Sequence, residues 1–410
     1  MKTTMETQSL LDRARLALAL VILNSHGSTC FAQGSLTPPG APAPIMKTLA
    51  QIEPRTLIDS IPFVITNSGS YYLASSLVAS AINQNGITIL TGDVTVDLNG
   101  FALIGIPGSS NGIYASAITV SNLVIRNGTI RNWGQDGVAG ARFNPLNSAE
   151  VRNSIFEKVL LSNNGHGLRT GSGCIVKDCV TTANADGIIA GDNSVVSGCT
   201  ATRNSGLGIF SGSNSTIKEC TASGNGTEGI TAVYSSTVIA CSAYNNGTKG
   251  IYGLGRNTIK DCTVVNNLVL GISVDSQSTI KDCTAVANSG TGIDAGFHSI
   301  VSQCTVSQNQ ADGIRVSGYC IVLENTCNGN SGAGNALHAT GSGNRIESNN
   351  ITFNNGIGLK VDAAGNLIIK NSAAQNTGAN YSIAAGNSDA RIIAGTTGFS
   401  TTNAWANFSF

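Results

Sequence analysis

Four residues in the first half of the sequence could together transfer protons or hold a charged ligand. Asp136, His166 and Asp186 each stand immediately before a glycine, and Arg169 lies two residues beyond Gly167. If these glycines occupy equivalent places in neighbouring repeats, the carboxylates and the imidazole can approach within hydrogen-bond distance. We therefore take Asp136, His166, Arg169 and Asp186 as the first candidate catalytic site.

The place before the glycine also supports a plainer interpretation. It is occupied elsewhere by Leu207, Glu228, Lys249, Leu270 and Thr291. In that interpretation the position varies freely, and the charged residues have no common role. Both interpretations stay open from the sequence.

A second group of charged residues falls in three consecutive repeats. It consists of Asp275, Asp294, Asp312 and Arg315, with His298 nearby. Asp294 and Arg315 occupy the same place one repeat apart, so an exposed ion pair of little energetic value also explains them.

An internal repeat must position both groups. A glycine followed by isoleucine recurs at 21-residue intervals. The pairs are Gly187-Ile188, Gly208-Ile209, Gly229-Ile230, Gly250-Ile251, Gly271-Ile272, Gly292-Ile293 and Gly313-Ile314.

Cysteine and asparagine form two further columns. The cysteines are Cys179, Cys199, Cys220, Cys241, Cys262, Cys283 and Cys304, continued by Asn325, Asn349 and Asn371. Five residues after each of the first eight come Asn184, Asn204, Asn225, Asn246, Asn267, Asn288, Asn309 and Asn330. Parallel Cβ vectors do not readily give the disulfide dihedral, so we expect a structural ladder of free, inward thiols. The asparagines can form a hydrogen-bonded ladder.

A unit of 21 residues with three short alternating segments cannot bury an apolar face alone and must stack on its copies. The sequence predicts an all-β solenoid, a parallel β-helix of roughly 14 turns with three short strands per turn. Ile217, Val238, Ile259 and Ile280 should lie in its core.

This repeat resembles the right-handed parallel β-helix of the pectate-lyase-like superfamily over about three quarters of the chain. Gln135-Asp136-Gly137 and Gly165-His166-Gly167-Leu168 are similar to two polygalacturonase motifs. The resemblance implies that Asp136 is an acid candidate with His166 as its polar neighbour. Gly137 stands where the family has a second Asp, and the family's Asn-Thr-Asp and Arg-Ile-Lys motifs are absent, which removes most of that mechanism.

The same resemblance implies lyase chemistry for the second group. Asp275 and Asp294 would hold Ca²⁺ against a uronate carboxylate, and Arg315 would remove the neighbouring proton. Phe210, Tyr234 and Tyr252 fall on successive repeats and could stack on sugar rings or pack turns.

The two ends of the chain differ from the repeat. Residues 1–32 read as a signal peptide, residues 33–85 as an N-terminal extension and cap, 86–383 as the β-helix and 384–410 as a C-terminal cap. Met46 to Glu53 could form a short helix, and Phe399, Trp405, Phe408 and Phe410 could cover the core. We expect an exported protein, secreted or at the cell surface.

Composition limits the partners. Charged residues make up 11% of the chain and the formal net charge is zero, which argues against nucleic acid. No later segment is long and apolar enough to span a membrane. Two functions remain: a protein that interacts with extracellular or cell-wall polysaccharide, as a lyase or glycoside hydrolase, or a non-catalytic surface rod or adhesin-like module.

Overall fold

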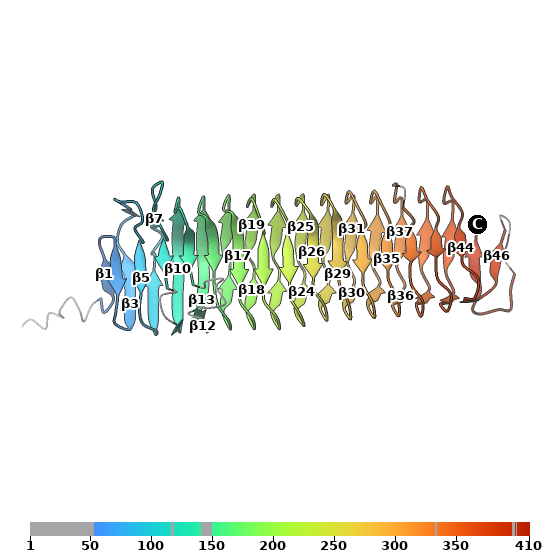
Figure 1. The fold of residues 1–410 in the computed structure, drawn as a ribbon, viewed down its shortest axis with the longest axis horizontal. Coiled ribbons are helices and arrows are strands. Elements are labelled where there is room, and N and C mark those ends of the chain that lie inside the picture. The colour runs from blue at the N-terminus through green and yellow to red at the C-terminus, as the bar shows by residue number, and fades with distance from the viewer. Residues whose placement is uncertain (1–52, 116–118, 141–149, 333, 396–397, 399) are drawn as a thin grey trace, which may run out of the picture. The chain divides into compact units, whose positions relative to one another are not determined.

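The computed structural model describes residues 53–115, 119–140, 150–332, 334–395, 398 and 400–410. The chain divides into two units, 1–54 and 55–410, and the second is a parallel β-solenoid (Figure 1). The described residues contain strands and no helix, so none of them forms a helix that could cross a membrane. The expected helix over Met46 to Glu53 and the expected signal peptide lie essentially outside the described residues.

One sheet contributes a single strand to each of about 15 turns, one more turn than predicted. We call it the 15-stranded sheet. Its strands are β2 Phe63–Ile65, β5 Ile87–Ile89, β8 Ile113–Tyr114, β11 Asp136–Ala139, β14 His166–Arg169, β17 Asp186–Ala190, β20 Ile209–Ser211, β23 Ile230–Ala232, β26 Lys249–Gly253, β29 Leu270–Val274, β32 Ile293–Ala295, β35 Ile314–Val316, β38 Leu337–Ala339, β41 Leu359–Val361 and β44 Tyr381–Ile383.

The other two strands of each turn belong to a 30-stranded sheet that contains two ladders. The first ladder comprises β1 Thr56–Ile58, β3 Gly69–Leu73, β6 Val94–Asp97, β10 Leu123–Arg131, β13 Ile155–Ser162, β15 Ile175–Lys177, β18 Val195–Ser197, β21 Thr216–Lys218, β24 Thr237–Ile239, β27 Thr258–Lys260, β30 Thr279–Lys281, β33 Ile300–Ser302, β36 Ile321–Leu323, β39 Arg345–Glu347, β42 Leu367–Ile369 and β45 Ser388–Asp389. The second ladder comprises β4 Leu77–Val78, β7 Ala102–Ile104, β16 Val180–Thr182, β19 Thr200–Thr202, β22 Thr221–Ser223, β25 Ser242–Tyr244, β28 Thr263–Val265, β31 Thr284–Val286, β34 Thr305–Ser307, β37 Thr326–Asn328, β40 Asn350–Thr352, β43 Ser372–Ala374, β46 Ile392–Ala394 and β47 Asn407–Ser409.

The two long strands β10 and β13 join these ladders. β10 pairs with both β6 and β7, and β13 pairs with both β15 and β16. A small two-stranded sheet, β9 Val120–Ser121 with β12 Val151–Arg152, lies in the same part of the chain.

The regular turns from Cys174 onward share one rule at their corners. A residue with positive φ bends the chain, and a small inward side chain follows it. In one turn, Ala240 (φ 53°) precedes Cys241, and Asn245 (φ 55°) precedes Asn246. Cysteine, asparagine and serine recur at these inward places, whereas in the earlier, longer turns the buried Trp133 follows Asn132 (φ 64°).

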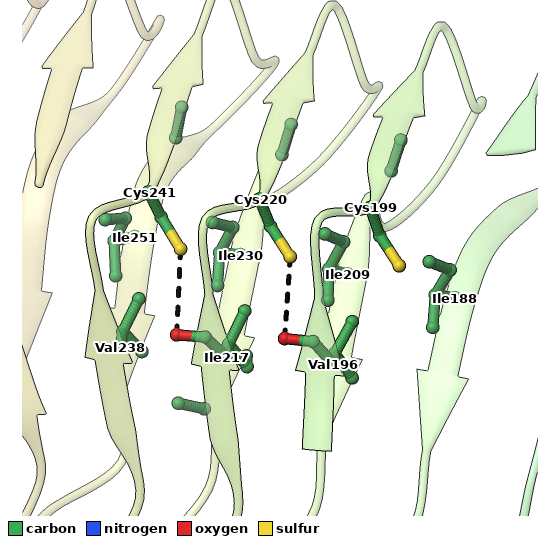
Figure 2. Packing of buried hydrophobic residues seen from close by; sticks show 14 of the residues in the cluster. Ile188, Val196, Cys199, Ile209, Ile217, Cys220, Ile230, Val238, Cys241 and Ile251 are labelled. Carbon is green, nitrogen blue, oxygen red and sulfur yellow. Dashed lines mark hydrogen bonds between the residues drawn. The ribbon is translucent and has the colours of Figure 1, made fainter. Parts of the chain in front are cut away.

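The core is a column of aliphatic side chains, with the seven cysteines from Cys179 to Cys304 that form the predicted column at one corner. Figure 2 shows isoleucines and valines of successive turns stacked in register, with Cys199, Cys220 and Cys241 above them. Ile217, Val238, Ile259 and Ile280 are fully buried, which confirms the predicted core. Cys220 Sγ donates to the Val196 carbonyl at 3.6 Å and Cys241 Sγ to the Ile217 carbonyl at 3.7 Å.

All ten described cysteines are free and buried, and burial raises the pKa of the Cys174, Cys320 and Cys327 thiols. Since the thiolate is the reactive form, we expect these cysteines to be inert in the folded protein. A chromogenic thiol reagent should label none of these ten cysteines in the native protein, and all ten after unfolding in denaturant. Rapid labelling of several thiols without denaturant would contradict this packing.

The asparagine ladder is confirmed. Asn246 Nδ2 donates to Asn267 Oδ1 at 3.0 Å and to the Ala222 carbonyl at 3.1 Å, and its backbone N–H also reaches Asn267 Oδ1. The same pattern repeats turn after turn. The side-chain oxygen of each asparagine accepts hydrogen bonds from the backbone and side-chain nitrogens of the asparagine in the neighbouring turn. A second ladder of Asn325, Asn349 and Asn371 continues the cysteine column and ends on Asn407 of β47.

The ends of the solenoid differ from the expected boundaries. Parallel pairing already begins at Thr56, where β1 pairs with β3, and Phe63 is in register with Ile87, so turns precede position 86. At the other end, β47 pairs with β43 beyond position 383. Trp405 and Phe410 are exposed rather than inserted in the core, because Ala406 and Asn407 take the buried places. Phe399 lies outside the described residues.

Candidate active site on the 15-stranded sheet

The outward face of the 15-stranded sheet brings the first candidate residues together. Asp136, His166 and Asp186 begin the successive strands β11, β14 and β17 and are in register. Arg169 ends β14 and pairs with Ala139, whose short side chain leaves the Arg169 side chain room to reach Asp136.

Asp136 is the centre of this site and is fully buried. Its Oδ1 lies 2.8 Å from His166 Nδ1, and its Oδ2 accepts a hydrogen bond of 2.8 Å from Arg169 Nε and another from Arg169 Nη2. The backbone N–H of Asp136 donates to Asn111 Oδ1, a partner from the preceding turn that sequence reasoning missed. Asn111 stands before Gly112, so the column of residues before each glycine contained the signal.

His166 is the most accessible member of the site and lies between two carboxylates. Its Nε2 is 3.4 Å from Asp186 Oδ2, on the side away from Asp136. Asp186 Oδ1 accepts a hydrogen bond of 2.8 Å from the Leu207 backbone N–H, which fixes that carboxylate. The imidazole is therefore fixed at Nδ1 by Asp136, while Nε2 lies near Asp186 and part of the ring remains open to solvent.

This geometry does not favour Asp136 as the proton donor to a substrate. The Asp136 carboxylate is buried, and both of its oxygens are occupied by the imidazole and the guanidinium, so a substrate cannot reach it. Its contacts suit it to orient His166 and Arg169 instead. The accessible groups of the site are His166, Arg169 and Asp186.

A groove of about 340 Å³ lies beside Arg169 on the same part of the coil. Ile189 and Phe210 form its apolar floor, and Thr170, Glu150 and Asp192 supply polar groups. An apolar floor with a few polar groups at its edge is the usual character of a small-ligand site.

The second group is only partly assembled. Asp294 and Arg315 are in register on β32 and β35, but the part of the chain that the structure describes contains no ion pair between them. Asp275 instead accepts from the Tyr252 hydroxyl at 3.2 Å. Asp312 instead forms a hydrogen bond with His338, a residue that sequence reasoning missed.

His338 joins two carboxylates across three turns. Its Nδ1 lies 3.0 Å from Asp312 Oδ2 and its Nε2 lies 2.7 Å from Asp362 Oδ2. Lys360 Nζ lies 3.3 Å from Asp362 Oδ1. The residues Ala336-Leu337-His338 replace the usual Gly-Ile motif, so the sequence did mark this turn as different.

This network gives the stability of the protein a pH dependence. The hydrogen bond to Asp312 raises the pKa of His338. Burial raises the pKa of Asp312, but the bonds from His338 and Asn335 outweigh it and leave that pKa lowered. The imidazolium therefore stabilises the fold below about pH 6.5, and this contribution is lost as pH rises through the raised pKa. The contribution of Asp312 is present above about pH 4 and is lost as pH falls through its lowered pKa.

We expect His338→Gln to lower the free energy of unfolding by about 2 kcal/mol near pH 5.5 and by much less above pH 8. Denaturant unfolding of both proteins across this range measures the difference. A difference that does not change with pH would contradict a charged His338.

The two calcium candidates Asp275 and Asp294 do not belong to a larger group of described metal-ligating side chains. Within residues 53–410, as far as they are described, no three His, Cys, Asp or Glu side chains are grouped to hold a metal ion. The aromatic residues also separate: Phe210 and Tyr252 share an outward column with Thr231 between them, whereas Tyr234 lies at a corner.

The family of the chain follows from the fold and its repeat. The protein-family model described as "Right handed beta helix region" matches this sequence at residues 111–257, 147–301 and 255–397. Together these matches span more than half of the chain. The protein therefore belongs to the right-handed β-helix family, as the repeat predicted.

Several solved structures are similar to this chain at low sequence identity. The A-module of mannuronan C-5 epimerase AlgE4 from Azotobacter vinelandii is 17% identical, with 77% of this chain and 90% of that chain covered and a TM-score of 0.47. The surface adhesin PfbA of Streptococcus pneumoniae is 12% identical, with coverages of 74% and 87% and a TM-score of 0.38. The periplasmic alginate epimerase AlgG is 11% identical, with coverages of 72% and 76% and a TM-score of 0.41. No curated protein sequence matches the chain.

Proposed function

We propose that this chain is an exported protein that binds an acidic polysaccharide over β11, β14 and β17 and cleaves it as a lyase. The contact between buried Asp136 and accessible His166 carries this proposal. A carboxylate behind an imidazole fixes the tautomer and the orientation of the ring, as a proton-transferring histidine requires. Export rests on the predicted signal peptide.

The roles follow from the positions of the side chains. With the Nδ1 proton directed at Asp136, His166 presents the Nε2 lone pair and can take the proton next to a uronate carboxylate. Arg169 stabilises the charge that develops on that carboxylate. The imidazolium so formed lies between Asp136 and Asp186. The bond to the leaving sugar oxygen then breaks, a carbon–carbon double bond forms, and the imidazolium returns its proton through a water molecule to the leaving oxygen.

A hydrolase fits this geometry less well. An inverting glycosidase needs two carboxyl groups on opposite sides of the scissile bond, with room for water between one of them and the sugar. Here both carboxylates contact one imidazole, and Asp136 is closed to solvent. Only Asp186 could face a substrate.

A non-catalytic rod or adhesin-like module is the second candidate function. The observation in its favour is the regularity of the turns between Cys179 and Cys304, which repeat the same ladder contacts with varied outward residues. A rod needs uniform turns and no special site.

The test is depolymerisation of polygalacturonate, alginate and a neutral glucan by the purified protein. We expect the ultraviolet absorbance of unsaturated products with an acidic substrate, and a loss of about 10²–10⁴-fold in rate for His166→Ala. His338→Gln, on the same face, is the matched control and should retain the rate. No product from any substrate would favour the rod.

A further inference from the structure

Exposed aromatic side chains gather at the corner that follows the 15-stranded sheet, away from the His166 site. Tyr234, Phe297 and Tyr319 leave 51%, 54% and 58% of their surfaces exposed. The ring of His298 stacks on Tyr319, with 5.1 Å between centroids and 7° between planes. Single exposed apolar residues are ordinary on a protein surface, but a row along one corner is not.

Each of these three rings lies against a glycine of the next turn. A Cβ atom added to Gly255 would stand 3.4 Å from the Tyr234 ring, and one added to Gly318 would stand 3.2 Å from the Phe297 ring. At Gly343 it would stand 2.6 Å from the Tyr319 ring. The glycines therefore let one side of each ring pack on backbone while the rest of the ring stays open.

Two members of the row occupy backbone positions that disfavour bulky side chains. His298 and Tyr319 have φ values of 59° and 57°. The equivalent corner positions of other turns hold Asn193, Asn214, Ser235, Arg256, Gln277 and Gly365. Rings occupy this position in the two successive turns of His298 and Tyr319, where they stack on each other.

Polar groups stand beside the first ring. A shallow cavity of about 320 Å³ is lined by Tyr234, Gly255, Arg256, Ser276 and Gln277. Arg256 Nε donates to Gln277 Oε1 at 3.0 Å, which holds both side chains at its edge. The cavity thus has one aromatic wall and several hydrogen-bonding groups.

We propose that this aromatic corner, formed by Tyr234, Phe297, His298 and Tyr319, is a second glycan-binding site that takes the pyranose rings of a neutral polysaccharide. The C–H face of a sugar ring stacks on an aromatic face, and its hydroxyl groups can reach Arg256, Ser276 and Gln277. The corner lacks the cluster of cations that a polyanion would need. The site is independent of catalysis at His166 and would serve an enzyme or an adhesin-like module equally.

Affinity electrophoresis of the full-length mature protein in gels that contain hydroxyethylcellulose, galactomannan or polygalacturonate tests this proposal. We expect retardation by at least one neutral polysaccharide. Tyr319→Asn should weaken that binding by about tenfold, since stacking on one ring is worth roughly this factor. The midpoint of thermal unfolding should stay the same or rise, because asparagine suits the positive φ.

The matched control is Phe353→Asn. Phe353 is 61% exposed and has a φ of 57°, but it lies at a different corner of the coil. It should bind like the native protein. No retardation by either neutral polysaccharide, an unchanged Tyr319→Asn variant, or an equal loss in Phe353→Asn would each overturn the proposal. His166→Ala should keep this binding, so failure of the lyase proposal and failure of this one are distinguishable.

Discussion

Replacing Asp136 by alanine is expected to lower the free energy of unfolding by about 3–5 kcal/mol, the usual cost of removing one partner from a buried ion pair. The variant leaves the Arg169 guanidinium and the His166 imidazole facing a space that no longer holds a carboxylate. Denaturant unfolding followed by circular dichroism measures the change. The same variant should lose the proposed activity, since His166 is no longer oriented.

The control for this prediction is Asp275→Ala. Asp275 is an exposed aspartate in the turn after β29, and its contact is the Tyr252 hydroxyl. Its loss should change the free energy of unfolding by less than about 1 kcal/mol. Equal effects at Asp136 and Asp275 would mean that burial and pairing of Asp136 contribute little.

Replacing Asn267 by alanine is expected to cost about 3 kcal/mol, because it leaves several buried polar groups without partners. Asn267 Oδ1 accepts from the backbone and side-chain nitrogens of Asn246, and its Nδ2 donates to Asn288 Oδ1 and the Ala243 carbonyl. Alanine removes all four contacts in the middle of the ladder. Thermal and denaturant unfolding should both detect the loss.

Asn355→Ala serves as the comparison for the ladder. Asn355 is exposed, and its side chain donates to the Ser331 carbonyl at the surface. We expect a change of less than about 0.5 kcal/mol. If Asn267→Ala were as mild, water or a shifted turn would have replaced the ladder contacts.

The fold could be predicted from the sequence because the repeat period equals the number of residues in one turn. Residues 21 apart in the sequence are neighbours in adjacent turns. The pairs Gly229-Ile230 and Gly250-Ile251 therefore indicate one ladder, and Cys220 and Cys241 indicate another. The first turn escaped prediction because Phe63 follows Pro62 rather than a glycine, and because it does not lie 21 residues before its partner Ile87.

The sequence predicted which residues of the first candidate site lie together, but it did not predict that Asp136 is buried. Asp136, His166 and Asp186 share one column, and the register of that column brings them together. The burial of Asp136 depends on Arg169 reaching across from another column, which spacing alone does not reveal. His338 was missed because the turn before it is longer than 21 residues. The spacing therefore did not indicate that His338 is in register with Arg315.

The repeated turns have a consequence for the length of the molecule. Since Gly229 and Gly250 occupy equivalent places, deletion of residues 229–249 would bring Glu228 next to Gly250 and leave every inward column intact. The groups around Asp136 and Asp312 would then stand about 4.8 Å closer, one strand spacing. The distance between sites along the solenoid therefore changes in steps of one turn. Evolution can add or remove whole turns without changing the inward columns.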